Sequence, residues 1–119
     1  MKAVGVDMIE TERVAQSVAR FGDRFLQRVY TERELAYCRG QINSLAARWA
    51  AKEATAKALG TGIGEVGWRE IEVVSEANRR PILQLHGAAA ALAAQLGLTD
   101  FAVSLSHTKE YAIAFVVGE

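Results

Sequence analysis

The feature that most constrains the fold is an alanine-rich segment from Ser44 to Leu59 that contains neither glycine nor proline. Alanine has the highest helix propensity, and Gly60 directly after the segment is a natural C-terminal stop. We therefore expect the longest helix of the chain here. A length of 119 residues leaves room for one hydrophobic core, so we expect a single domain over residues 1–119.

The remaining pattern predicts an α+β fold, with helices mostly in the first half and antiparallel strands mostly in the second. Apolar spacing predicts helix from Thr11 to Tyr30 with a break at Gly22, and a capping box of Thr31 and Glu34 begins a short helix that ends at Gly40. The other expected elements are strands at 2–6, 68–74, 82–85, 101–106 and 111–117 and a helix at 87–96, with a hairpin turn at Asn78–Arg80. The strand 111–117 is apolar on both faces, which indicates subunit packing.

Charge and apolar patterning exclude several classes of protein. The chain has 14 Lys+Arg and 14 Asp+Glu, and this balance gives no support to a nucleic-acid or membrane-surface binder. The most apolar stretch, 87–98, is too short to span a bilayer, and the amino terminus lacks the apolar run of a secretory signal. A lone cysteine, Cys38, excludes an internal disulfide framework. We expect a cytoplasmic protein without membrane insertion.

Charged residues gather on the predicted long helix. Arg48 and Lys52 are four residues apart, and so are Trp49, Glu53 and Lys57, which places charge on two adjacent helix faces. One interpretation is a solvated helix with salt bridges between successive turns. The other is a magnesium-bound phosphate site, where Glu53 holds the metal and lysines contact the phosphate oxygens.

A second carboxylate, Asp7, is expected at the end of the first strand, either as a ligand or as a cap of the following helix. Asp7 and Glu53 together would suit Mg²⁺, which prefers hard oxygen ligands. The spacing of His86, His107 and Cys38 does not resemble a zinc site.

Two further segments offer phosphate-binding groups. Residues 62–67 read GIGEVG and match G-x-G-x-x-G, but a helix precedes them and a strand follows, which is the reverse of a dinucleotide-binding fold. A simple helix-to-strand connection is favoured, although its backbone N–H groups could approach a phosphate. Ser104, Ser106 and His107 form a cluster of donors at a strand end, or an ordinary turn.

Three blocks of the sequence resemble one known family. Gly5-Val6-Asp7 is followed six residues later by Arg13, the segment 48–54 reads RWAAKEA with KALGTG at 57–62, and 103–107 reads VSLSH. Together they resemble the holo-acyl-carrier-protein synthases, the short, single-domain type of 4′-phosphopantetheinyl transferase. Trp49 stands where the family usually has Phe, a conservative aromatic change.

The resemblance implies transfer of phosphopantetheine from coenzyme A to a serine of apo-acyl-carrier protein, with release of adenosine 3′,5′-bisphosphate, by default in fatty-acid synthesis. Asp7 and Glu53 would hold Mg²⁺, or Mn²⁺, against the pyrophosphate of coenzyme A. Lys57 would neutralise phosphate oxygens and help the leaving group. Glu53, directly or through a metal-held water, would accept the serine proton, so Glu53 and Lys57 are the expected catalytic residues.

The resemblance also implies a coenzyme A-binding set, which comprises Arg48, Lys52, Lys57, Gly60, Gly62, Ser106 and His107. The family is trimeric with sites at subunit interfaces, so we expect trimerisation through the strands and His107 from a neighbouring subunit. Helices in the first half would pack on a small antiparallel sheet, as in the family fold.

The resemblance also suggests a role for the arginines that share one face of the segment from Thr11 to Tyr30. Carrier proteins are acidic, and the expected docking residues are Arg13, Arg20, Arg24 and Phe25, with Arg28 less certain. The alternative is an ordinary solvated face.

Two rival functions remain open. One is a catalytically silent coenzyme A or carrier-protein binding module on the same fold, and the other is an unrelated α+β interaction protein. The presence of Asp7, Glu53 and Lys57 together favours the enzyme.

Overall fold

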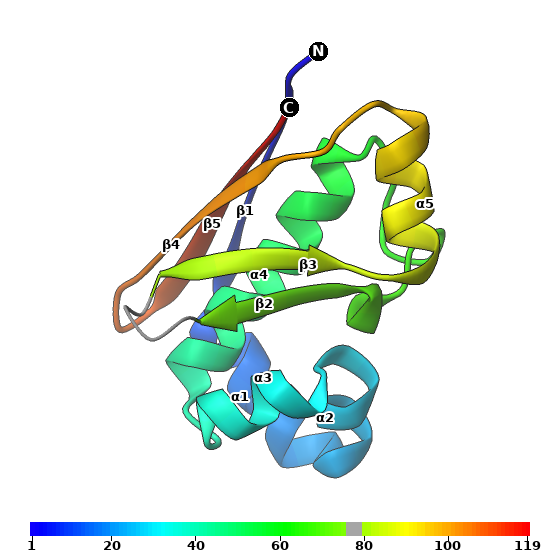
Figure 1. Ribbon diagram of the computed structural model, residues 1–119. Helices are drawn as coiled ribbons and strands as arrows, with labels where there is room; N and C mark the ends of the chain where they lie inside the picture. The colour runs from blue at the N-terminus through cyan, green and yellow to red at the C-terminus, as the bar shows by residue number, and fades with distance from the viewer. Residues whose placement is uncertain (76–79) are drawn as a thin grey trace.

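The long helix α4 (Ile42–Ala58) lies at the centre of the molecule between two sheets (Figure 1). The structure is a computed structural model that describes residues 1–75 and 80–119. One sheet consists of β1 (Ala3–Glu10), β5 (Tyr111–Gly118) and β4 (Phe101–His107), in the order β1-β5-β4. The other is the hairpin of β2 (Ile71–Ser75) and β3 (Pro81–Leu85).

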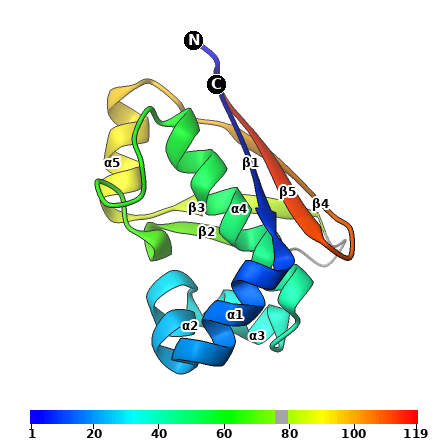
Figure 2. The same ribbon diagram turned by 180° about the vertical axis from the view of Figure 1, so that it is seen from behind.

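The remaining helices lie at the two ends of α4. Figure 2 shows three short helices together at one end and α5 (Gly87–Gln95) at the other. The three are α1 (Thr11–Phe21), α2 (Asp23–Val29) and α3 (Glu32–Cys38). A 3₁₀ helix, η1 (Trp68–Glu70), precedes β2. Among the described residues, no helix has the length and apolar character needed to cross a bilayer.

Small residues let α4 approach the three-stranded sheet closely. Ala50, Ala51 and Ala54 have no exposed surface. Gly5 on β1 lies against the backbone carbonyl of Ala54, where any Cβ at position 5 would collide. This contact explains why the sequence combines an alanine-rich helix with a glycine in its first strand, and it brings the residues that flank Gly5 onto the helix.

Several sequence predictions are confirmed. The fold is α+β, and most helices precede most strands. Gly22 separates α1 from α2 with a φ of 55°, a conformation that favours glycine. The capping box of α3 is present, because Thr31 N donates to Glu34 Oε1 at 2.9 Å and Glu34 N donates to Thr31 Oγ1 at 3.2 Å.

Other boundaries differ from the predictions. Asp7 lies in the middle of β1 rather than at a strand end, because β1 pairs with β5 along its whole length, up to Glu10 opposite Tyr111. The helix α4 begins at Ile42 rather than Ser44. Residues 68–70 form η1 instead of strand, and β2 does not alternate, since Glu72 is buried as well as its neighbours Ile71 and Val73. Most of the predicted turn at Asn78–Arg80 lies outside the described residues.

The face of the three-stranded sheet that points away from α4 is apolar and open. On β5, Ala112, Ala114 and Val116 face α4 and are fully buried, whereas the alternate residues are exposed. This outer face consists of Val4, Val6 and Met8 on β1 and Tyr111, Ile113 and Phe115 on β5, each between 39% and 61% exposed. The prediction that the last strand is apolar on both sides is thus confirmed.

Candidate active site

A lysine from α4 and an aspartate from β1 form the polar centre of the helix–sheet contact. Lys57 Nζ lies 3.0 Å from Asp7 Oδ1 and also donates to the carbonyl oxygen of Val6 at 3.1 Å. Asp7 reaches the helix because it lies two positions after Gly5, on the same inward face of β1. The Lys57 side chain is 53% exposed and that of Asp7 only 13%, so the pair lies at the edge of the core.

The two acidic residues expected to bind metal influence each other. Burial and the negative charge of Asp7 raise the pKa of Glu53 above its ordinary value, while Lys57 opposes this effect. The second oxygen of Asp7, Oδ2, is buried and has no hydrogen-bond partner among the described residues. A buried carboxylate oxygen without a partner is costly.

This arrangement fits a hard divalent cation. A cation would satisfy Asp7 Oδ2 and relieve the repulsion between Asp7 and Glu53. Among the described residues no group of three or more His, Cys, Asp or Glu side chains gathers in a metal-binding cluster. Two protein carboxylates, with remaining positions left to water and substrate oxygens, are typical of Mg²⁺ rather than of structural Zn²⁺.

A cavity of about 440 Å³ lies beside the first half of α4. Arg48 lines it with only 3% of its surface exposed, stacks its guanidinium 4.3 Å from the ring centre of Tyr37 and donates from Nη2 to Ser75 Oγ at 2.8 Å. Its Nε is buried and has no hydrogen-bond partner within residues 1–75 and 80–119. Ser104 and His107 of β4 line the same cavity. A buried guanidinium with an unused donor, in a cavity with a histidine, is suited to bind an anion.

His107 and Ser106 lie on opposite sides of the sheet. His107 pairs with Ala112 and lines the Arg48 cavity of its own chain. The expectation that His107 of a neighbouring subunit completes the site stays a prediction. Ser106 pairs with Ile113 on the outer face and lines a second, largely apolar hollow together with His107, Met8 and Tyr111. Both residues therefore line this hollow, but only His107 also lines the Arg48 cavity.

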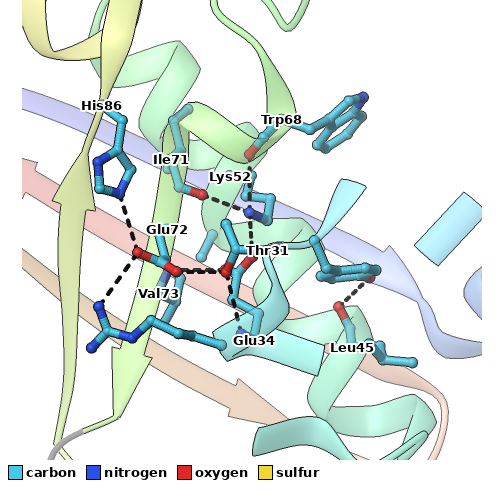
Figure 3. Close-up of polar contacts among 12 residues, drawn as sticks. Thr31, Glu34, Leu45, Lys52, Trp68, Ile71, Glu72, Val73 and His86 are labelled. Carbon is cyan, nitrogen blue, oxygen red and sulfur yellow. Dashed lines mark hydrogen bonds and ion pairs between the residues drawn. The ribbon is translucent and has the colours of Figure 1, made fainter. Parts of the chain in front are cut away.

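The structure corrects the expectation that Lys52 contacts the nucleotide's phosphates. Lys52 has no exposed surface, and its ammonium donates to Glu34 Oε1 at 2.7 Å and to the carbonyl oxygens of Trp68 and Ile71 at 2.9 and 2.6 Å (Figure 3). These three bonds use all the donors of the side chain. Burial lowers the pKa of Lys52, and the Glu34 charge opposes this effect.

The alternative of a solvated helix face is wrong for this side of α4, since Arg48 and Lys52 are both buried. Gly60 and Gly62 are exposed in the segment that follows the helix, and they do not line the Arg48 cavity.

The basic residues of the first helices surround an apolar groove. A hollow of about 240 Å³ lies between α1 and α2, lined by Ser17, Phe21, Arg24, Phe25 and Arg28. Phe21 is 48% exposed, and the Arg20 guanidinium lies 5.2 Å from the centre of its ring. Arg13 is exposed on α1 but does not line the groove. The groove combines cations with exposed aromatic surface.

Three residues of these sites were not predicted from the sequence. Glu34 was assigned only as a capping residue, and Tyr37 and Ser75 were not assigned at all. The capping box was a signal for one role of Glu34, but nothing local in the sequence indicates that Lys52, 18 positions away, is its partner. Tyr37 and Ser75 contact Arg48 only through the tertiary fold.

Comparison with known proteins identifies the family of this chain. Residues 3–116 match the 4′-phosphopantetheinyl transferase superfamily, and the chain belongs to it. The holo-[acyl-carrier-protein] synthase of Herpetosiphon aurantiacus is 53% identical over 125 residues, covering 99% of this chain and 98% of that protein. The holo-[acyl-carrier-protein] synthase of Chlamydia trachomatis is 44% identical over 123 residues, and this alignment covers 100% of both chains.

Solved structures show the same fold. The Helicobacter pylori holo-[acyl-carrier-protein] synthase in complex with coenzyme A has a TM-score of 0.90 to this chain at 30% identity, covering 98% of this chain and 99% of that one. The enzyme from Neisseria meningitidis has a TM-score of 0.89 at 35% identity, with 98% and 97% covered.

Proposed function

We propose that this chain is an Mg²⁺-dependent transferase that moves 4′-phosphopantetheine from coenzyme A to a serine of apo-acyl-carrier protein. The observation that carries the proposal is the buried, unpartnered Oδ2 of Asp7 beside Glu53 and Lys57, where a cation and a phosphate can meet. The near full-length similarity to holo-[acyl-carrier-protein] synthases supports the same reaction. A cytoplasmic location and a role in fatty-acid synthesis are part of the proposal.

In the proposed reaction the serine oxygen forms a bond to the β-phosphorus of coenzyme A, and the bond from that phosphorus to adenosine 3′,5′-bisphosphate breaks. Asp7 and Glu53 would hold Mg²⁺, or Mn²⁺, and the bound cation would supply stabilisation of the charge that develops on the pyrophosphate. Lys57 would turn from Asp7 toward the phosphate oxygens, which its partly exposed side chain permits. The raised pKa of Glu53 suits a group that takes up the serine proton.

The cavity at Arg48 is the proposed nucleotide site. Arg48 would donate its Nε–H to a phosphate oxygen, and His107 of β4, which lines the same cavity, would contribute a second contact. Tyr37 and Ser75 hold the guanidinium in place, so its direction is fixed before the nucleotide arrives. Gly60, Gly62 and Ser106 remain proposed contacts of the longer coenzyme A chain.

The groove between α1 and α2 is the proposed docking site of the carrier protein. Arg20 and Arg24 would meet acidic side chains, and Phe25 would give apolar contact at the groove, with Arg13 at its edge.

We further propose a homotrimer that packs through the outer face. Exposed apolar side chains run without interruption across β1 and β5, and a contiguous surface of this kind marks an interaction site.

A catalytically silent binding module on the same fold is the second candidate. The test is to follow release of adenosine 3′,5′-bisphosphate from coenzyme A by chromatography. Release that needs both the carrier protein and Mg²⁺ is the expected result. Binding of coenzyme A without any release would favour the silent module.

A further inference from the structure

The buried lysine beside Glu53 connects the active-site helix to three other elements. Lys52 belongs to α4, Glu34 to α3, Trp68 to η1 and Ile71 to β2, and the bonds that join them converge on a single ammonium group (Figure 3). Both oxygens of Glu34 accept further bonds within the chain, Oε1 from Thr31 N and Oε2 from Val73 N, each at 2.9 Å. All three donors of Lys52 and both oxygens of Glu34 are therefore engaged inside the protein.

The side of α4 on which Lys52 finds its bonding partners determines how the helix is rotated about its own axis. Successive residues on a helix point about 100° apart, so a helix that aims Lys52 at β2 and α3 necessarily aims Glu53 elsewhere. Glu53 faces the side where Asp7 influences its charge and where Lys57, one turn later, bonds to Asp7. On that side the helix backbone contacts Gly5 directly. The helix is therefore held between β1 on one side and the Lys52 cluster on the other.

If stability were its only role, a buried charged pair at this position would be energetically unfavourable compared with apolar residues. Removing two ions from water costs several kcal/mol per ion, and well-packed apolar residues often serve a core equally well. Apolar side chains, however, permit a helix to rotate or slide slightly, whereas three hydrogen bonds from one ammonium define a direction. The geometry thus indicates that the Lys52–Glu34 pair specifies the position of α4.

We propose that Lys52 and Glu34 are positioning residues, which set the rotation of α4 and thereby bring Glu53 into register with Asp7 as a metal-binding pair. This inference rests on the proposed function, in which Asp7 and Glu53 hold the metal. It assigns the lysine next to Glu53 to the protein interior rather than to the nucleotide.

The test compares the unmodified chain with Lys52→Met and with the double variant Lys52→Met/Glu34→Met, which leaves no unpaired charge in the core. Three quantities are measured: Mn²⁺ affinity from the electron paramagnetic resonance signal of the free metal, affinity for adenosine 3′,5′-bisphosphate in excess chelator, and kcat. Lys2→Met, which removes an exposed lysine, is the matched control.

We expect the double variant to unfold cooperatively, like the unmodified chain, while its Mn²⁺ affinity falls about tenfold or more. Its kcat should fall on the order of 100-fold, the scale of a misplaced catalytic group. Its nucleotide affinity in chelator should fall much less than its Mn²⁺ affinity, because Tyr37 and Ser75 hold Arg48 through separate contacts. Lys2→Met should match the unmodified chain in all three measurements.

The proposal is overturned if the folded double variant keeps its Mn²⁺ affinity and kcat. It is equally overturned if nucleotide affinity in chelator falls while Mn²⁺ affinity does not, since Lys52 would then contact the nucleotide. Should the double variant not fold, Glu34→Gln keeps the side-chain shape, and unchanged Mn²⁺ affinity in that variant contradicts the proposal. Because metal binding is read without transfer, an unmodified chain that binds Mn²⁺ but modifies no carrier protein would refute the proposed function alone.

Discussion

Lys57 of α4 neutralises one oxygen of Asp7 on β1, at 3.0 Å, while the other oxygen of the same carboxylate is buried without a partner in the part of the chain that the structure describes. A folded protein rarely leaves such an oxygen unsatisfied. The relationship places a half-satisfied carboxylate, a lysine with a half-exposed side chain and a second acid, Glu53, at one helix–sheet contact. We propose on this basis that the contact binds a cation together with a phosphate.

Removal of either acid should abolish most of the activity. Asp7→Ala and Glu53→Ala are each expected to lower kcat by at least about 100-fold, because each removes a group that stabilises charge in the transition state. Both variants should remain folded, as circular dichroism can check. Asp100→Ala, an exposed acid elsewhere, is the control and should keep normal activity. Near-normal turnover in Asp7→Ala or Glu53→Ala would make that residue structural.

Transfer should depend strictly on a divalent metal. Two carboxylates with a single lysine cannot offset the charge of a pyrophosphate, so excess chelator is expected to stop product formation. Added Mg²⁺ or Mn²⁺ should restore it. The check is a rate measured across a metal titration, and full activity in chelator would refute the metal assignment of Asp7 and Glu53.

The prediction from sequence was most successful where a local pattern dictates structure. The alanine-rich run, the break at Gly22 and the capping box at Thr31 each have a short-range cause, and all three are present. The extent of β1 was missed because its pairing with β5, at the far end of the chain, decides it.

The candidate site shows the same difference between what local sequence predicts and what tertiary contacts decide. The motif around Glu53 points to α4 as the helix of the candidate site, but a motif does not tell which of its charged residues point inward. Lys52 reads as a phosphate ligand in sequence, and only the tertiary contact with Glu34 shows it to be buried.

Carrier-protein docking should be sensitive to charge at the groove between α1 and α2. Arg24→Glu is expected to raise the KM for carrier protein several-fold at low salt, with little change in the KM for coenzyme A. Added salt should weaken docking of the unmodified chain in the same way, because exposed charges are screened beyond about 10 Å at 0.1 M. Arg69→Glu is a matched control at an exposed arginine outside the groove. An unchanged carrier-protein KM in Arg24→Glu would mean that docking occurs elsewhere.

Glu72 should contribute to stability in a pH-dependent manner. Burial opposes its charged form, but hydrogen bonds from Thr31 and His86 and the nearby Arg33 lower its pKa below the ordinary 4.5. A depressed pKa in the folded state means that the stabilisation is present above pH 4.5 and is lost as the pH falls through the folded value.

Denaturant unfolding across this pH range checks the prediction. Glu72→Gln should lower the free energy of unfolding at pH 7, and the difference from the unmodified chain should shrink on acidification. Glu32→Gln, at an exposed position on α3, should show no such pattern. A difference between Glu72→Gln and the unmodified chain that stays constant down to low pH would contradict the assignment.

The outer face should hold subunits together. Ile113→Asp places a charge within the exposed apolar surface of β5, so it is expected to convert a trimer into monomers in sedimentation velocity. Gln27→Asp, on the exposed side of α2, should leave the assembly unchanged. If the unmodified chain sediments as a monomer, the proposed trimer is wrong.

The most direct test is the mass of the carrier protein itself. An apo-acyl-carrier protein is incubated with coenzyme A, Mg²⁺ and this chain, and its mass and modified residue are then determined by tandem mass spectrometry. The account predicts the gain of one phosphopantetheine on a single serine, absent in chelator, strongly reduced with Glu53→Ala and absent when that serine is replaced by alanine. An unmodified carrier protein after prolonged incubation with the folded, metal-loaded chain would contradict it.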